Sequence, residues 1–155
     1  MNVNDYLIDP ANRDWNDLLD DWKWILPNKF TPWLVNRFGD IFMVLSDGTV
    51  HMLDVGAGRL DLLANDRNDF CTKLDEDQNA DEWLLISLVD SLTENGMKLN
   101  EDECYSFITQ PGLGGEYEKE NVKVYDISVH YAVTGQIFEQ IKDIPDGTKI
   151  TFNYE

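Results

Sequence analysis

Hydrophobic residues recur at two different periods along this chain, and the period changes from one segment to the next. Between Asp14 and Leu26 they follow the i, i+3, i+4, i+7 spacing of a single helix face. The residues on that face are Trp15, Leu18, Leu19, Trp22, Ile25 and Leu26. Asp14 is suited to cap this helix, and Pro27 prevents its continuation. The pattern therefore predicts a helix from Asp14 to Leu26.

Alternation with a period of two predicts strands in the section that follows. The segments 41–45 (IFMVL) and 50–54 (VHMLD) flank the turn 46–48 (SDG), in which glycine supplies the positive φ that a short hairpin needs. A second turn at 56–58 (GAG) leads into a strand expected at 59–63. We expect a small antiparallel meander, and its imperfect alternation indicates that some strands are covered on both faces.

Two helices are expected after the meander. The first spans 65–74, and its inward residues are expected to be Phe70, Cys71 and Leu74. Asn79 is suited to cap the second helix, because Asp81 and Glu82 in its first turn oppose the positive end of the helix dipole. Gly96 ends it in the left-handed conformation. Its apolar face consists of Trp83, Leu85, Leu88, Val89 and Leu92.

Short strands are predicted again at 104–108 and 122–125, joined by a loop at 111–121. A helix is predicted at 128–142, because apolar residues repeat there every four positions. These residues are Val129, Val133, Ile137 and Ile141. The β-branched content of 122–133 leaves a strand open as the alternative for this region.

The end of the chain is expected to turn at 145–147 (PDG) and to finish in a strand that contains Ile150, Phe152 and Tyr154. Together these elements predict the α+β class: a mainly antiparallel, twisted sheet packed against several helices. We expect one domain over 1–155, with an N-terminal helical segment at 1–32. The content of apolar residues, 43%, is ample for a core.

The location expected from the sequence is the cytoplasm. The longest apolar run is too short to span a membrane, and the first ten residues (MNVNDYLIDP) lack the pattern of a secretory signal. Cys71 and Cys104 are expected to be reduced, buried thiols, with a single disulfide as the alternative.

Charge narrows the choice of partner. Thirty acidic residues oppose twelve basic ones, which gives a formal net charge of −18. Binding to nucleic acid or to an anionic membrane surface is disfavoured, because both need clustered lysine and arginine. Two interpretations remain: the acidic surface keeps the protein soluble and monomeric, or it binds a basic partner. Residues 61–120 hold sixteen acidic and four basic residues, and so carry −12 of the net charge.

No motif for a metal, a cofactor or catalysis is complete. The acidic run that begins at Asp75 has Ala80 and Ile86 where a calcium loop needs glycine and glutamate. The glycines at 56–58 and 112–115 lack the remaining residues of dinucleotide-binding and phosphate-binding loops. We therefore expect no cofactor and no metal, and the sequence holds no specific signal for an enzyme.

Cysteine and histidine offer one remaining catalytic arrangement. Cys71 or Cys104 could pair with His51 or His130 in a small hydrolase, although structural roles for both histidines are the simpler interpretation. This hydrolase stays open as an alternative.

Several segments, in order, resemble the C-terminal domain of immunity proteins for type VI secretion DNase effectors, a family grouped near the SMI1/KNR4-type immunity superfamily. The segments are FGDIF (38–42), HMLDVG (51–56), ADEWLL (80–85), ECYSF (103–107), LGGEY (113–117) and QIKDIPDG (140–147). The resemblance covers roughly residues 33–150. It implies an α+β fold, in agreement with the elements predicted above.

The resemblance also implies a function: binding to a cognate toxin, commonly a nuclease, and neutralising it without catalysis. Many members of the family carry a preceding GAD-like domain. About 32 residues precede the similar region here, so we expect that domain to be missing or replaced. The free protein is expected to be a monomer.

The contacts with a basic toxin are expected on two acidic clusters and one loop. They are Asp75, Glu76, Asp77, Glu101, Asp102 and Glu103, with Pro111, Leu113, Glu116 and Tyr117 in the loop. An acidic surface would speed association with such a toxin. The alternative within the wider superfamily is a regulatory or scaffold module that binds a cellular protein.

Overall fold

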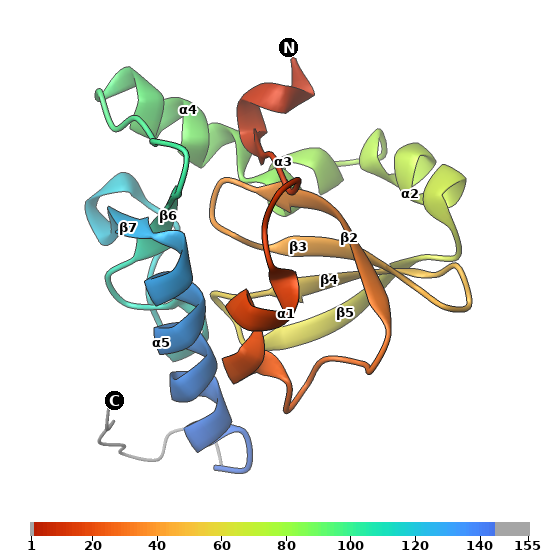
Figure 1. Cartoon of the computed structure of the whole chain (residues 1–155). Coiled ribbons are helices and arrows are strands. Elements are labelled where there is room, and N and C mark those ends of the chain that lie inside the picture. The colour runs from red at the N-terminus through yellow and green to blue at the C-terminus, as the bar shows by residue number, and fades with distance from the viewer. Residues whose placement is uncertain (1, 145–155) are drawn as a thin grey trace.

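The computed structural model describes residues 2–144 and contains two antiparallel sheets packed against helices (Figure 1). The strands are β1 (Leu7–Ile8), β2 (Phe30–Asn36), β3 (Ile41–Leu45), β4 (Val50–Asp54), β5 (Arg59–Ala64), β6 (Glu103–Phe107) and β7 (Val122–Asp126). The α-helices are α1 (Trp15–Leu18), α2 (Arg67–Leu74), α3 (Asn79–Leu84), α4 (Ile86–Glu94) and α5 (Ile127–Ile141). Short 3-10 helices are η1 (Val3–Tyr6), η2 (Asp20–Trp22), η3 (Pro111–Leu113) and η4 (Lys119–Asn121). The predicted α+β class is confirmed.

The larger sheet is the predicted meander, with strand order β1-β2-β3-β4-β5. The hairpin between β3 and β4 turns as expected: the Leu45 amide donates to the Thr49 carbonyl at 3.0 Å, and Gly48 has a φ of +86°. The smaller sheet pairs β6 with β7, and Tyr105 lies opposite Val124.

Both faces of the larger sheet are covered, as its imperfect alternation predicted. Phe42 and Met52 join one apolar layer, which also contains Phe70 of α2 and the buried residues of α3 and α4. The neighbouring residues Ile41 and Met43 face a second layer, made with α5 and the segment that leads into η2. Figure 1 shows α2, α3 and α4 along one side of the sheet and α5 upright beside β6 and β7.

The predicted helix from Asp14 to Leu26 is wrong in length. Asp14 does cap it, accepting a hydrogen bond from the Asp17 amide at 3.1 Å, but α1 ends at Leu18 and the chain continues as η2. This tighter turn directs Trp22 under α5, where its indole N–H donates to the Tyr131 carbonyl at 3.0 Å. Packing against α5 therefore overrides the helical period.

The second predicted helix is divided in two at Leu85, which has a φ of +53°. The Asp81 carboxylate lies across the break and accepts hydrogen bonds from the Ser87 amide (2.8 Å) and hydroxyl (2.7 Å). Asn79 does not act as the predicted cap, because its side-chain amide donates to the Lys73 carbonyl at 2.8 Å. The end of the helix is as predicted, with Gly96 at a φ of +80°.

Two helix faces differ from those predicted. Cys71 of α2 is exposed, and only Phe70 of that helix is buried. In α5, Val129 is 44% exposed, although it belongs to the predicted apolar stripe. The residues that α5 buries are Ile127, His130, Tyr131, Thr134, Gly135, Ile137 and Phe138. Residues 122–133, for which the sequence left strand and helix as alternatives, contain both. The strand β7 ends at Asp126, and the same residue caps α5.

The expected turn at 145–147 and the strand containing Ile150, Phe152 and Tyr154 lie outside the described residues. Among residues 2–144, the structure has no helix with the length and apolar character that crossing a bilayer requires.

His130 joins α5 to both sheets. One ring nitrogen lies 2.9 Å from the Ser106 hydroxyl oxygen of β6, and the other lies 3.0 Å from the Phe38 carbonyl in the turn between β2 and β3. The adjacent Tyr131 hydroxyl donates to the Gly39 carbonyl at 2.6 Å. Gly39 has a φ of +81°, and a Cβ there would lie 3.1 Å from the His130 ring, so the turn and the helix require this glycine.

Burial lowers the pKa of His130 from 6.5 to about 4, because the charged ring would lose its hydration. The unfolded chain therefore binds a proton below pH 6.5 that the folded chain does not take up until about pH 4. This contribution to stability is present above pH 6.5 and is lost as the pH falls. We expect the free energy of unfolding to decrease by about 2 kcal/mol between pH 6.5 and about pH 5.

Urea unfolding of the wild type and of a His130→Asn variant, each across this pH range, measures the contribution. The variant will be less stable at pH 7. Between pH 6.5 and about pH 5, its free energy of unfolding should fall by about 2 kcal/mol less than that of the wild type. Burial raises the pKa of Asp40, and that shift acts in the opposite direction in both proteins. Only the difference between the two curves is therefore informative, and equal slopes would contradict the prediction.

Candidate functional site

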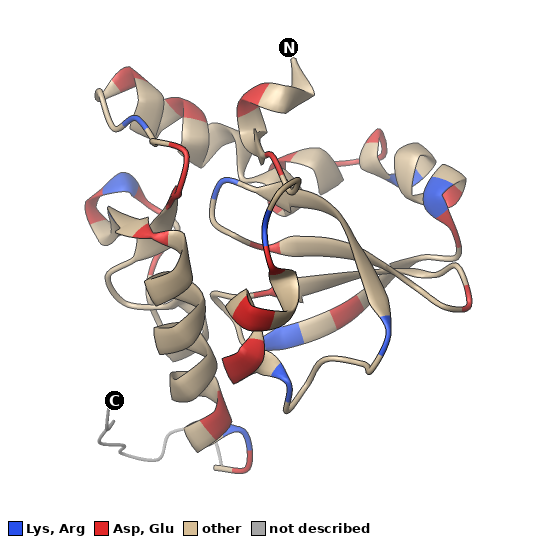
Figure 2. Cartoon of the chain, viewed as in Figure 1, with Lys and Arg blue, Asp and Glu red and all other residues tan. Residues whose placement is uncertain are grey.

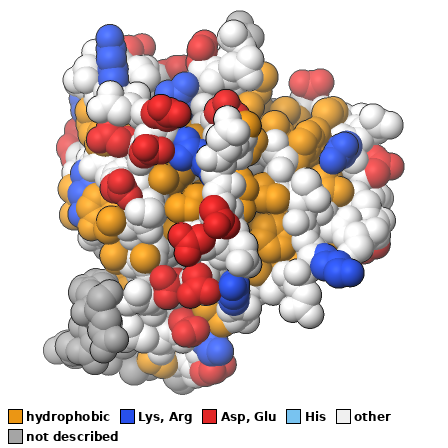
Figure 3. Space-filling view, viewed as in Figure 1, with side chains coloured by type: hydrophobic (Ala, Val, Ile, Leu, Met, Phe, Trp, Pro, Cys, Tyr) orange, Lys and Arg blue, Asp and Glu red, His pale blue; other side chains and the backbone are white. Residues whose placement is uncertain are grey.

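An acidic cleft of about 600 Å³ lies where three segments that are distant in sequence meet. They are 7–18 at the N-terminus, 99–103 before β6, and 126–128 at the start of α5. Its acidic residues are Asp9, Asp14, Asp17, Glu101, Asp102, Glu103 and Asp126, against the two basic residues Arg13 and Arg37. Figure 2 shows acidic positions on each of these segments, and Figure 3 shows acidic side chains gathered along the middle of the same face.

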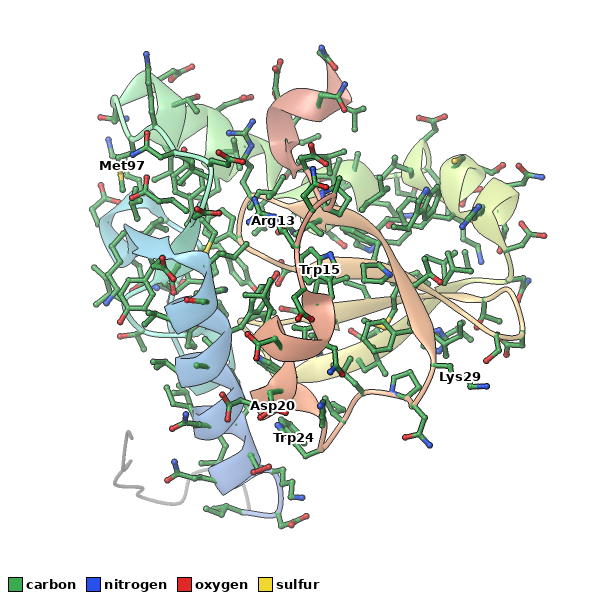
Figure 4. The ribbon with its side chains drawn as sticks, in the orientation of Figure 1. Arg13, Trp15, Asp20, Trp24, Lys29 and Met97 are labelled. Atoms are coloured by element: carbon green, nitrogen blue, oxygen red, sulfur yellow. The ribbon has the colours of Figure 1, made fainter. Side chains whose placement is uncertain are left out.

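Arg13 fixes the two longer walls of the cleft relative to each other. Its guanidinium donates to the Glu101 carbonyl at 2.7 Å and to the Asp9 carbonyl at 3.0 Å, and it lies 3.4 Å from the Asp102 carboxylate. The Arg13 side chain is only 11% exposed, whereas that of Asp102 is 79% exposed. In Figure 4, Arg13 points from the N-terminal segment toward the chain that enters β6. The cleft is thus held by a buried cation and presents carboxylates to solvent.

The third wall follows from the way α5 begins. The Asp126 carboxylate accepts hydrogen bonds from the Ser128 amide at 2.9 Å and from the Val129 amide at 3.2 Å. The hydrogen bonds from Ser128 and Val129 hold the pKa of Asp126 below its ordinary value, so this carboxylate is ionised at neutral pH. The Ile127 amide donates to the Asp102 carbonyl at 2.9 Å and ties α5 to the second wall.

The structure places the predicted contact residues on separate surfaces. Glu101, Asp102 and Glu103 line the cleft. Asp75, Glu76 and Asp77 are exposed in the connection between α2 and α3, which Figure 1 shows on the other side of α3 from β6 and α5.

The predicted loop forms part of neither acidic group. Pro111 and Leu113 lie in η3, and Glu116 is exposed in the loop that follows. Tyr117 is 52% exposed and packs edge-on against Phe107, with ring centroids 5.3 Å apart. Burial raises the pKa of Tyr117 to about 12, so its hydroxyl is neutral and available as a hydrogen-bond donor.

Sequence reasoning missed the cleft residues outside 101–103. Asp9, Asp14 and Asp17 lie nearly ninety residues before them, and Asp126 follows after β6 and β7. The sequence offers one signal for this site. Arg13 is the only basic residue within four positions of Asp9, Asp14 and Asp17. That spacing is compatible with an internal ion pair but does not identify the partner, Asp102.

The cysteine and histidine side chains do not form the arrangement that the hydrolase alternative requires. Both ring nitrogens of His130 are paired with oxygen atoms, and His51 lies 3.4 Å from the Thr49 hydroxyl. Burial raises the pKa of the Cys104 thiol, which keeps it protonated, and Cys71 is on an exposed face of α2. No cluster of metal-ligating side chains is present among residues 2–144.

Comparison with known proteins finds a family match for part of the chain. Residues 64–138 match the family model described as T6SS immunity protein Tdi1, C-terminal, and this confirms the predicted family for that stretch, within the range 33–150 expected from the sequence. A search of curated proteins found no match. Among solved structures, the chain is similar to the crystal structure of Atu4351 from Agrobacterium tumefaciens, with 18% sequence identity and a TM-score of 0.48. The alignment covers 78% of this chain and 60% of that one.

Proposed function

We propose that this chain, whose residues 64–138 belong to the C-terminal family of type VI secretion immunity proteins, binds a cognate effector and neutralises it. The family match carries this proposal. The finer parts are that the effector is a nuclease with a basic active-site surface, that neutralisation occurs in the cytoplasm, and that it needs no catalysis. The net charge of −18 and the acidic cleft support a basic partner.

Neutralisation by binding alone is physically simple. A nuclease needs basic residues around its active site to hold the phosphates of its substrate. The carboxylates of the cleft would attract those residues over a distance of about 10 Å at moderate salt and so speed the encounter. Once seated, the protein would cover the groove that the nucleic acid must enter.

The cleft is the first surface we assign to the partner, with Glu101, Asp102 and Glu103 as its predicted contacts. The second acidic cluster (Asp75, Glu76 and Asp77) and the loop residues Pro111, Leu113, Glu116 and Tyr117 remain proposed contacts. Because the two acidic groups lie on separate surfaces, their contributions can be tested separately.

The test is a tagged pull-down of the full chain from its native cells at moderate salt, with bound proteins identified by mass. We expect one stoichiometric partner with a toxin domain, and we expect co-expression of this chain to rescue cells that produce that toxin. If only housekeeping proteins are captured from cells shown to make the effector, and rescue fails, the regulatory module is the better interpretation.

Charge reversals show which acidic surface contributes. Asp17→Lys with Glu101→Lys removes two cleft carboxylates that form no hydrogen bond with other described residues, and should slow association about tenfold at low salt. Glu94→Lys with Glu139→Lys is the control, because it makes the same change in net charge at exposed positions outside both proposed acidic surfaces. Equal association rates for the two variants would assign the effect to net charge and not to the cleft.

A further inference from the structure

A second hollow, of about 540 Å³, lies between the β6–β7 ribbon and α5. We call it the α5 groove. Its apolar lining residues are Phe107, Ile108, Leu113, Tyr125, Val133 and Ile137. Ile108 is 59% exposed, which is unusual for a large aliphatic side chain that follows directly on a buried strand. The groove is therefore an open apolar surface.

The helix contributes Val133 and Ile137 to this groove, and Val129 continues their stripe beyond it. Val129, Val133 and Ile137 follow one another at intervals of four residues and so share a face of α5. Along this stripe the side chains change from buried at Ile137, through half-buried at Val133, to 44% exposed at Val129. The core buries only the Ile137 end of the stripe, and the Val129 end faces solvent.

The charge of the groove is opposite to that of the rest of the protein. None of its lining residues is acidic, and one is a lysine, Lys123, whose ammonium lies 4.4 Å from the centre of the Tyr125 ring. The same wall contains Gln110, which is only 7% exposed and whose carbonyl oxygen has no hydrogen-bond partner within residues 2–144. A cationic segment would find no carboxylate here, whereas an uncharged apolar one would meet complementary walls.

The groove and the acidic cleft are bordered by successive turns of α5. Asp126, Ile127 and Ser128 line the cleft, and the next turn of α5 brings His130 and Val133 into the groove. The groove also lies wholly within residues 64–138, the stretch that matches the immunity family, whereas one wall of the cleft lies outside it.

We propose that the α5 groove binds an uncharged apolar segment on the surface of the effector, while the basic part of the effector occupies the adjoining cleft. This inference rests on the proposed function. It makes Ile108 the energetic centre of the groove contact, with Val129 at its edge, since desolvated apolar contacts surrounded by polar residues contribute most to protein complexes. The cleft then supplies association rate, and the groove supplies residence time.

The structure offers a matched pair of double variants for the test. Ile108→Asp with Val129→Asp changes one lining residue, which is 59% exposed, and the residue that continues the α5 stripe beside the groove, which is 44% exposed. Leu62→Asp with Val3→Asp changes two residues elsewhere that are 60% and 41% exposed, with the same change in charge. The affinity of each purified variant is measured for the effector captured with the wild-type chain. We expect the groove variant to bind about 100-fold more weakly and the control to stay within about threefold of the wild type.

Each other outcome overturns the proposal in a distinguishable way. If no effector is captured by the wild type, the proposed function fails and the groove has no such occupant. If the effector binds the groove variant as tightly as the control, the groove inference alone fails. If the groove variant converts a dimer of the free protein to a monomer, the occupant is a second copy. If it lowers the unfolding midpoint while the control does not, the two side chains serve the fold of this chain itself, and the loss of affinity does not support the groove inference.

Discussion

Replacing Phe70 by alanine is expected to lower the free energy of unfolding by about 4 kcal/mol, since large aromatic side chains in a core contribute about this much. Phe70 is 1% exposed and is the only buried residue of α2. Three other rings surround it: Trp33 at 5.2 Å, Trp83 at 5.3 Å and Phe42 at 5.5 Å between ring centroids. Alanine would leave a cavity that these rigid rings cannot close.

The loss should be concentrated in α2, because this eight-residue helix is too short to be stable without tertiary packing. Urea unfolding monitored by tryptophan fluorescence measures the effect, since Trp33 and Trp83 both contact Phe70. Cys71→Ala is the matched control: it truncates the exposed neighbour in the same helix and should change stability by less than about 0.5 kcal/mol. A cost below about 2 kcal/mol for Phe70→Ala would mean that the aromatic cluster rearranges to fill the space.

Gly135→Ala is expected to destabilise the protein by about 3 kcal/mol, although the same change in the middle of an exposed helix would stabilise it by about 1 kcal/mol. A Cβ on Gly135 would lie 2.6 Å from the carbonyl oxygen of Asp21 and 2.8 Å from its carbonyl carbon. These are backbone atoms of η2, so the clash cannot be relieved by a side-chain rotation. Relief requires moving η2, and with it Trp22, away from α5.

Ala132→Gly supplies the control for helix propensity alone, because this residue is half-buried on the same helix. It should cost about 1 kcal/mol in the same unfolding measurement. A Gly135→Ala variant as stable as the wild type would show that α5 and η2 are not held in contact at this point. The residue with the lowest helix propensity in α5, Gly135, is thus the one that allows close packing between α5 and η2.

In the proposed complex, the acidic cleft and the α5 groove contribute to binding in different ways. Carboxylates exposed in a cleft act over a distance and depend on salt, whereas the apolar groove acts only on contact. Salt should therefore change the association rate strongly and the dissociation rate weakly, since surface ion pairs themselves contribute little.

Local pattern was sufficient for most secondary structure of this protein. Strands β3 to β7, the turn at Gly48 and the helical nature of α5 follow from residues that are neighbours in sequence. The acidic character and the family were also evident without coordinates, because net charge and ordered short segments do not depend on how the chain folds.

Tertiary structure decided which parts of these elements meet. It ended α1 at Leu18 and broke the second helix at Leu85, because buried contacts outweighed helical propensity there. It turned the four-residue repeat of α5 partly toward solvent, and it brought Arg13 against Asp102, which is 89 residues away in the sequence. The periodicity of hydrophobic residues shows which side chains share a face of one helix or strand. It contains no information on residues that are distant in sequence and meet only in the folded chain. The cleft and the groove are made of such pairs, so only the folded chain defines them.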